Sequence, residues 1–211
     1  MSLTPLQEGL SYYRRRSRYL SAVGIAYYGL IILMALVTAN IEGGAAIKQA
    51  IMEEAFRGIR EMFPGLLEAY MADPPLAVAY TFSVNFLLGA VVTITVPGLL
   101  LFFLAPAMAL LRAALWGVIL SPASLLAALA VPTLMLEGLG YVLAAVPSAY
   151  LGLSWLCPER AFPGLDLSRL EALRREAPDA AKAYLWVAIV LLIAAMVEVG
   201  TVTIALLLRP I

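Results

Sequence analysis

The stretch LAVAYTFSVNFLLGAVVTITVPGLLLFFLAPAMALLRAALWGVIL, residues 76–120, contains a single charged side chain, Arg112. Extending the view to residues 74–158 adds only Glu137. A transmembrane helix needs roughly 20 consecutive apolar residues to cross a hydrocarbon core of about 30 Å. By length alone, this block would hold three long spans or four short ones. It indicates a helical membrane protein.

The composition of the whole chain points the same way. Of its 211 residues, 63% are hydrophobic and 13% are charged, and the mean hydropathy is +0.93. These values lie well outside the range of soluble domains. We therefore expect an all-α, polytopic transmembrane bundle that forms one integral membrane domain over residues 1–211. Because 14 basic residues balance 14 acidic ones, no charge excess indicates a nucleic-acid partner.

The residues that the sequence lacks exclude several classes of enzyme. It has no histidine and one cysteine, Cys157. Zinc peptidases, serine hydrolases with a Ser-His pair and His-ligated haem proteins all need an imidazole. The sequence also shows no paired cysteines and no glycine-rich phosphate loop. We therefore predict no enzymatic activity, no catalytic residue, no metal and no cofactor, and we place any ATP-driven step in a separate subunit.

The distribution of charge predicts the number of spans. The first apolar run follows four arginines: Arg14, Arg15, Arg16 and Arg18. By the positive-inside rule these place the amino terminus in the cytoplasm. Residues 159–182 are also rich in basic side chains, whereas residues 41–73 carry three basic side chains among six acids. Residues 159–182 are therefore expected on the inside and residues 41–73 on the outside. This requires an odd number of membrane crossings between the two segments. Five spans result, at about residues 20–40, 76–96, 98–120, 131–156 and 180–208.

Prolines predict where these spans break or bend. Pro97, followed by Gly98, is expected to form the turn between the second and third spans, and Pro147 to bend the fourth. Residues 121–130 open with a Ser-Pro helix start and are expected to form a half-helix or re-entrant segment that ends at Pro132. A break at that depth is tolerated only where protein or water covers the backbone.

Two polar segments complete the expected topology. Residues 41–73 show apolar side chains at helical spacing and predict an outer amphipathic helix closed by Pro64 and Gly65. Residues 157–179 form the cytoplasmic segment, in which Asp166 is expected to cap a short helix. Pro178 is expected to open the last span. Both segments would suit either the membrane interface or the docking of a partner protein.

Three ionisable side chains are expected within the spans: Arg112, Glu137 and Glu198. Each costs at least about 2.5–3.5 kcal/mol at membrane depth, so we expect them to face the bundle interior. One interpretation is structural, with Arg112 paired to one glutamate and the other glutamate protonated or hydrogen-bonded. The alternative is functional, because two carboxylates competing for one arginine would leave one able to bind a proton or a cation.

Two short motifs suggest a family. Residues 132–137 read Pro-Thr-Leu-Met-Leu-Glu, and residues 194–198 read Ala-Ala-Met-Val-Glu. Over roughly residues 80–207 the chain resembles the stage II sporulation protein M family of integral membrane proteins. That family has a Pro-His-Gly-x-x-Glu block opening one transmembrane helix and an Ala-Ala-x-x-Glu block inside the last. The positions that match these two blocks are Pro132, Glu137, Ala194, Ala195 and Glu198.

The first block departs from the family pattern, because its histidine and glycine are replaced here. Asn85 stands where the family often has an asparagine, and with Arg112, Glu137 and Glu198 it makes up the expected intramembrane polar network. The best-known members of the family scaffold cell-wall-remodelling hydrolases during engulfment in spore-forming bacteria. The resemblance therefore implies an integral membrane fold and a scaffolding role.

Three functions remain open from the sequence. We favour a non-catalytic membrane scaffold or assembly protein that recruits other membrane or cell-envelope proteins. The alternative is a permease or channel-like transport subunit with a buried Arg/Glu site, working with a separate ATPase. A third is an intramembrane enzyme that uses Glu137 and Glu198 as acid and base. In each case we expect a multi-pass protein of the cell membrane, in contact with the lipid bilayer, forming a homodimer and binding no nucleic acid.

Overall fold

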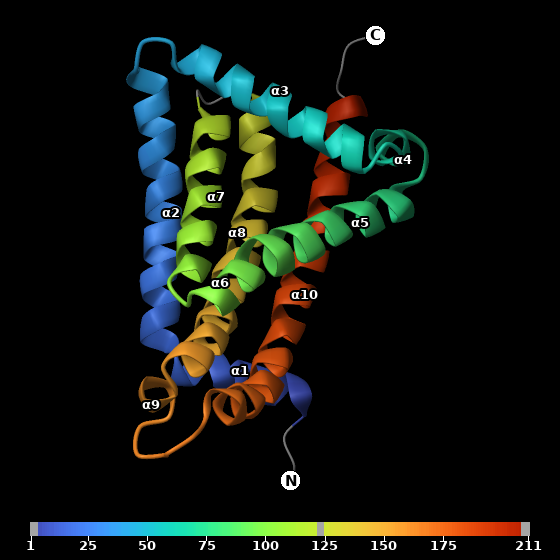
Figure 1. Cartoon of the computed structure of the whole chain (residues 1–211). Helices are drawn as coiled ribbons and strands as arrows, with labels where there is room; N and C mark the ends of the chain where they lie inside the picture. Colours follow the sequence, from blue (N-terminus) through green and yellow to red (C-terminus); the bar gives the residue numbers. More distant parts are fainter. Residues whose placement is uncertain (1–3, 122–124, 208–211) are drawn as a thin grey trace.

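The computed structural model describes residues 4–121 and 125–207, and every regular element within these ranges is helical. The elements, in chain order, are α1 (Pro5–Arg15), α2 (Ser17–Asn40), α3 (Gly44–Met62), α4 (Leu66–Ala72), α5 (Pro74–Ser83), the π-helix η1 (Val84–Thr95), α6 (Val96–Leu100), α7 (Leu104–Leu120), α8 (Leu125–Leu156), α9 (Pro158–Ala161) and α10 (Arg169–Leu207) (Figure 1). Four helical stretches are long and apolar enough to cross a membrane: Ser17–Asn40, Pro74–Leu100, Ala130–Leu156 and Arg169–Ile204. The predicted all-α membrane bundle is confirmed.

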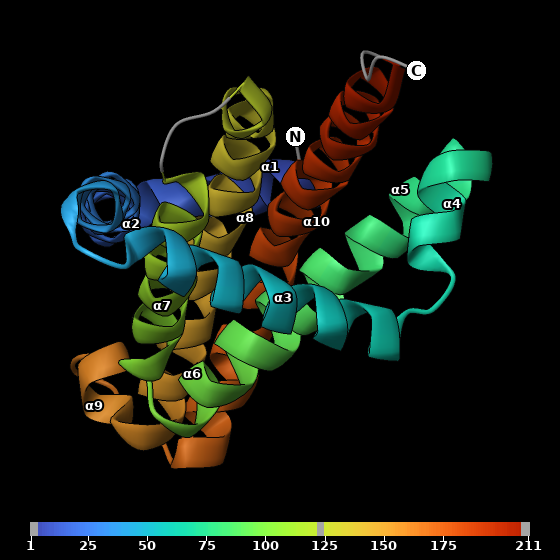
Figure 2. The same ribbon diagram turned by 90° about the horizontal axis from the view of Figure 1, so that it is seen from above.

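Helix α8 lies at the centre of the bundle. Every residue from Gly140 to Ala149 is buried. The long helices α2, α7 and α10 and the continuous α5–η1–α6 helix pack around it (Figures 1 and 2). Large apolar side chains remain exposed on the outer helices, among them Ile25 and Leu33 of α2 and Leu111 of α7. A surface as apolar as the interior is typical of a bundle that faces lipid.

The boundary between the second and third predicted spans differs from the expectation. The helix does not turn at Pro97 but continues to Leu100, and α7 begins only at Leu104. With 17 residues, α7 is about 26 Å long, slightly shorter than a hydrocarbon core of about 30 Å. The chain turns at residues 101–103, where the Leu104 N–H donates to the Leu101 carbonyl at 2.8 Å. Paired backbone groups allow a turn between apolar helices.

Gly98 serves packing rather than a turn. A Cβ added to Gly98 would lie 2.6 Å from the Cβ of Ala105 and 3.1 Å from that of Ser148. On the facing helix, a Cβ at Gly152 would overlap the Gly98 carbonyl oxygen. The two glycines therefore let the backbones of α6 and α8 touch, as small residues do between membrane helices.

Two helix starts that we predicted from prolines are wrong. Helix α8 runs from Leu125 through Pro132 and Pro147, so residues 125–130 are its first turns and not a separate half-helix. The expected first helical position, Pro122, lies outside the described residues. Helix α10 likewise runs through Pro178. An interior proline removes one backbone hydrogen bond, and the surrounding packing of a membrane helix can tolerate that loss.

Ser168, rather than Asp166, caps α10. The Ser168 backbone N–H donates to Glu171 Oε2 at 2.9 Å, and the Glu171 backbone N–H donates to Ser168 Oγ at 3.4 Å, which makes a capping box. The helix that we expected to be short is thus the beginning of the last span. At 39 residues α10 is about 58 Å long, so its first turns extend beyond a hydrocarbon core of about 30 Å.

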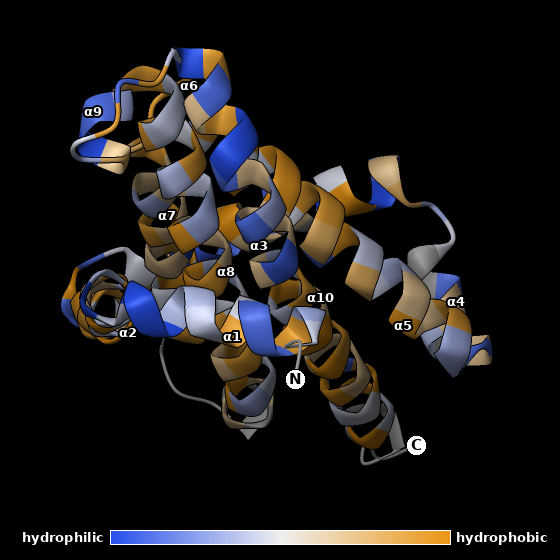
Figure 3. Cartoon of the chain, turned by 90° about the horizontal axis from the view of Figure 1, so that it is seen from below, coloured by the Kyte–Doolittle hydropathy of each residue, from blue (hydrophilic) through white to orange (hydrophobic). Residues whose placement is uncertain are grey.

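Helix α1 and the first turns of α10 lie at one end of the bundle, where α9 also lies (Figure 1). Arg16 Nη2 donates to both carboxylate oxygens of Glu176, at 2.9 and 3.1 Å, and the Tyr12 hydroxyl donates to the same group at 2.6 Å. Burial raises the pKa of the Tyr12 phenol, and the neighbouring Glu176 carboxylate raises it further, so Tyr12 stays a neutral donor. Seen from this end, hydrophilic residues are prominent on α1 and α9, while α5 and the far part of α10 are mostly hydrophobic (Figure 3).

At the opposite end, α3 runs from the top of α2 past the top of α7, and it contacts both of these helices (Figures 1 and 2). The amphipathic helix predicted within residues 41–73 is α3, and it ends before Pro64 and Gly65 as predicted; the second short helix, α4, follows it and was not predicted. Apart from Gly44, no side chain described in α3 is buried. The chain thus alternates between two ends, with residues 159–182 at the end that holds α1.

The glycine contact gives a test of the packing. Gly152→Ala is expected to destabilise the protein by about 1–3 kcal/mol, because its Cβ would overlap the Gly98 backbone. Gly29→Ala on α2 is the matched control, since a Cβ there has no atom within 4 Å. Thermal unfolding in a mild detergent measures both. Equal melting temperatures for the two variants would show that α6 and α8 are not in contact.

Candidate functional site

A cleft of about 300 Å³ opens between the helices near the end covered by α3. Its walls come from η1, α7, α8 and α10, with contributions from α3, α4 and α5. All four members of the expected polar network line it: Asn85, Arg112, Glu137 and Glu198. Further polar side chains on its walls are Tyr70, Thr81, Thr133 and Thr201. The structure therefore brings together polar residues that are as many as 131 positions apart, Tyr70 and Thr201.

A chain of hydrogen bonds connects Arg112 to Glu137. Arg112 Nη2 donates to the Tyr141 hydroxyl at 2.8 Å, and that hydroxyl donates to Asn85 Oδ1 at 2.9 Å. The Asn85 amide nitrogen then donates to Glu137 Oε1 at 2.5 Å. The guanidinium carbon of Arg112 also lies 4.1 Å from the centre of the Tyr141 ring, in cation–π geometry. Every donor in this chain points towards the carboxylate.

The π-helix places Asn85 in this chain. Asn85 is buried in its first turn, and Gly89 follows on the same side. A Cβ at Gly89 would lie 2.8 Å from Cε1 of Tyr141, so only glycine leaves room for the ring. Further along, the Thr93 and Thr95 hydroxyls donate to carbonyls five residues earlier, at 2.6 and 2.9 Å. Segments of π-helix are rare and often mark functional sites.

Glu198 approaches the site from α10. The Tyr70 hydroxyl of α4 donates to Glu198 Oε1 at 2.7 Å and lies 2.7 Å from the Thr81 hydroxyl of α5. Glu198 lines the same cleft as Glu137. Two carboxylates that share one buried cleft repel each other unless a proton or a cation neutralises part of their charge.

Several buried polar atoms at the cleft have no hydrogen-bond partner among the described residues. They are Glu137 Oε2, Thr133 Oγ1 and Arg112 Nε. Glu137 is 3% exposed and Thr133 is 5% exposed. An unpaired buried polar group costs about 1–3 kcal/mol, so a set of them at one cleft indicates a place for water or a ligand. The direct ion pair that we considered between Arg112 and a glutamate is not among the salt bridges of the described residues.

Among the polar members of the site that sequence reasoning missed are Tyr70, Thr133 and Tyr141. Two of them had a signal in the sequence, because Thr133, Glu137 and Tyr141 recur every fourth residue and share one face of α8. Tyr70 had none, since it lies in a short helix outside the spans.

The other residues that we singled out lie away from the cleft walls. Pro97 and Pro147 lie inside helices, and Pro132 is exposed one turn before Glu137. Ala194 and Ala195 are fully buried and pack within the bundle.

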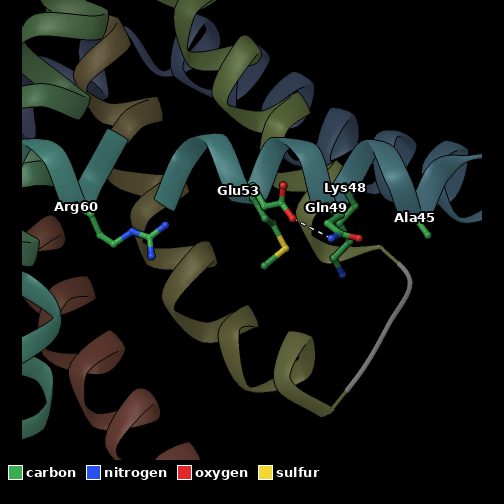
Figure 4. Close-up of a pocket in the computed structure, with 6 residues that line it drawn as sticks. Ala45, Lys48, Gln49, Glu53 and Arg60 are labelled. Carbon is green, nitrogen blue, oxygen red and sulfur yellow. Dashed lines mark hydrogen bonds between the residues drawn. The ribbon is translucent and has the colours of Figure 1, made fainter. Parts of the chain in front are cut away.

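A second hollow of about 390 Å³ lies along α3 and is lined by Ala45, Lys48, Gln49, Met52, Glu53 and Arg60. These side chains extend from α3 on the side of the first turns of α8 (Figure 4). Although this hollow is larger, its polar groups are mainly exposed, and Gln49 already donates to Glu53 at 2.8 Å. We therefore regard the Glu137 cleft as the candidate site.

No family model, curated protein or solved structure matches this chain. The chemistry of the cleft must therefore be read from its own residues. Within residues 4–121 and 125–207, no group of three or more His, Cys, Asp or Glu side chains is placed to hold a metal ion. The acidic part of the cleft consists of the two carboxyl groups of Glu137 and Glu198.

The hydrogen-bond chain can be tested with two tyrosines that are both 0% exposed. Tyr141→Phe is expected to cost about 1–3 kcal/mol, because it leaves Arg112 and Asn85 without their shared partner. Tyr27→Phe is expected to be neutral or stabilising, since the Tyr27 hydroxyl has no partner among the described residues. Unfolding in detergent compares the two variants. A Tyr141→Phe protein as stable as Tyr27→Phe would contradict the hydrogen-bond chain.

Proposed function

We propose that this protein is a permease-type membrane subunit that passes a small solute through the Glu137 cleft. The observation that carries the proposal is the cleft itself, lined by three intramembrane ionisable side chains and by buried polar atoms without partners. Ionisable residues in membrane helices that face a polar cavity are the usual mark of a substrate or ion pathway. From the sequence alone we favoured a scaffold over a permease. Because of the cleft, we now favour the permease.

The position of the cleft supports an opening towards one side of the membrane. It lies near α3, whereas the fully buried segment of α8, residues 140–149, lies between the cleft and the end that holds α1. The proposal includes a place in the cell membrane with the amino terminus in the cytoplasm, supported by the arginines before α2. The cleft would then open to the outside, and passage would require α8 and its neighbours to separate at the inner end. An energy source such as an ATPase would be a separate protein.

Reconstituted protein is expected to increase solute or proton flux across vesicles above the level of protein-free vesicles. Glu137→Gln is expected to lower that flux by roughly tenfold or more, which corresponds to about 1.4 kcal/mol. Glu159→Gln, the same change at an exposed position of α9, is expected to leave it unchanged. Ion-sensitive and pH-sensitive dyes inside the vesicles measure the flux, with and without candidate ATPases.

Access to the cleft provides a control that does not depend on knowing the solute. In a Cys157→Ser background, Thr133→Cys is expected to react with a charged, membrane-impermeant thiol reagent added on the α3 side. Ala145→Cys on the same helix is 0% exposed and should not react. A protein without flux whose Thr133→Cys variant is also inert would contradict the permease proposal.

The exposed helix α3 supports a second candidate, the membrane scaffold. Its apolar side chains Ile47 and Met62 are 45% and 58% exposed, at the end of the molecule opposite α1. Exposed apolar side chains on an amphipathic helix can dock a partner protein. Membership of the stage II sporulation protein M family belongs to this second proposal and rests on the Pro132–Glu137 and Ala194–Glu198 motifs.

The scaffold proposal predicts that α3 recruits proteins. The double variant Ile47→Glu and Met62→Glu is expected to lose proteins that co-purify with the wild type, because charges would replace the apolar contacts. Glu61→Gln, at an exposed position on the same helix, should keep them. Affinity purification followed by mass spectrometry compares the three proteins. An unchanged set of co-purifying proteins would remove this candidate.

A homodimer is a further proposal. Exposed apolar side chains on α2, such as Ile25 at 75% and Ile32 at 61%, would face either lipid or the second copy. The mass of the protein in a mild detergent, corrected for bound detergent, distinguishes a monomer from a dimer.

A further inference from the structure

The charges at the cleft do not balance. Glu137 and Glu198 can carry two negative charges, and Arg112 carries one positive charge. A net charge is costly in a medium of low dielectric constant, so the cluster favours one additional positive charge. Arg112 forms no salt bridge with either carboxylate among the described residues, and its Nη2 donates to Tyr141, which in turn donates to Asn85.

The oxygen atoms that could hold this positive charge are already in place. Glu137 Oε2 and Thr133 Oγ1 are buried, lack partners among the described residues and lie one helical turn apart on the wall of the cleft. The Glu198 carboxyl lines the same cleft from α10. Hard cations prefer such carboxylate and hydroxyl oxygens. The cleft of about 300 Å³ has room for water molecules to complete the coordination.

We propose that the cleft binds one monovalent metal cation, of the size of sodium, between the Glu137 and Glu198 carboxylates, with the Thr133 hydroxyl as a third ligand. This inference rests on the proposed transport function and names the ion that the site takes. A divalent ion is disfavoured by the charge count, because with Arg112 it would leave the cluster positively charged. It would also lack the additional acidic ligands that such ions usually have.

The neighbours of the carboxylates make the site selective for cations. The other titratable or charged groups that face the pair are Arg112 of α7, Tyr70 of α4, Tyr141 of α8 and, behind Tyr141, Tyr27 of α2. Tyr70 and Tyr141 donate hydrogen bonds at the site, and η1 and α5 contribute the uncharged side chains of Asn85 and Thr81. Protons are therefore the expected competitors of the metal ion, and binding should strengthen as the pH of the buffer rises.

Direct binding to the purified full-length protein in a mild detergent tests the inference without any transport assay. Equilibrium dialysis with radioactive sodium is expected to give one bound ion per chain. The melting temperature should be higher in sodium chloride than in N-methylglucamine chloride at equal ionic strength, because an ion that binds only the folded state stabilises it. Glu137→Gln and Glu198→Gln should abolish both effects, whereas Glu159→Gln should keep them.

Thr133→Val keeps the inference testable if the glutamate variants fail to fold. The substitution removes an unpaired buried hydroxyl, so it should stabilise the sodium-free protein. If Thr133 is a ligand, the same variant should weaken sodium binding about tenfold, which corresponds to about 1.4 kcal/mol. Sodium binding equal to that of the wild type would remove Thr133 as a ligand and overturn the proposed site.

Other outcomes also decide the matter. If the melting temperature depends on pH identically in sodium and in N-methylglucamine, the pair shares a proton and the metal-ion proposal is wrong. Tighter binding of magnesium than of sodium would overturn the charge argument. Flux of another solute without sodium binding would contradict the sodium site but would be consistent with the permease proposal. Sodium binding without any flux would support the sodium site and contradict the permease proposal.

Discussion

A carboxylate buried in the central helix of a membrane bundle is the constraint on which the arrangement depends. Glu137 is 3% exposed, and its surroundings offer no bulk water to solvate it. In place of water, η1 brings the Asn85 amide that donates to Glu137, and α7 brings the charge of Arg112 through Tyr141, while α10 adds a second acid, Glu198, to the same cleft. Because all of these must converge on α8, the helices that carry them are fixed in their relative positions.

The two ends of the bundle are built differently. At the α1 end, Arg16 and Glu176 form a nearly enclosed pair, with 15% and 5% of their side chains exposed, and Tyr12 adds a third bond. At the α3 end, helices α3 and α4 cover a cleft whose polar atoms are only partly paired. Arg16 Nε at the α1 end also lacks a partner among the described residues, but at the α3 end the unpaired atoms border a cleft, where a ligand or a movement can be accommodated.

The sequence predicted the parts of this structure that depend on local composition. Apolar length and the asymmetry of charge placed the long helices and put residues 159–182 at the amino-terminal end. Prolines were a poorer guide: Pro97, Pro132 and Pro178 lie inside helices because packing and capping elsewhere outweigh one lost hydrogen bond. The convergence on Glu137 could be expected from the cost of buried charge, but the role of Tyr70 depends on contacts between segments distant in the chain.

The π-helix within the second span has a mechanical consequence. A π-helical turn contains more residues than an α-helical turn, so converting one turn of η1 to α-helix would rotate one end against the other by about 100° per residue passed along. Thr95 anchors the far end through its bond of 3.0 Å with Ser148. The rotation would therefore swing the Asn85 amide away from Glu137 while the rest of the span stays docked. Such a rotation would change which side chain the span presents to the cleft, without a sliding movement of the whole span along its neighbours.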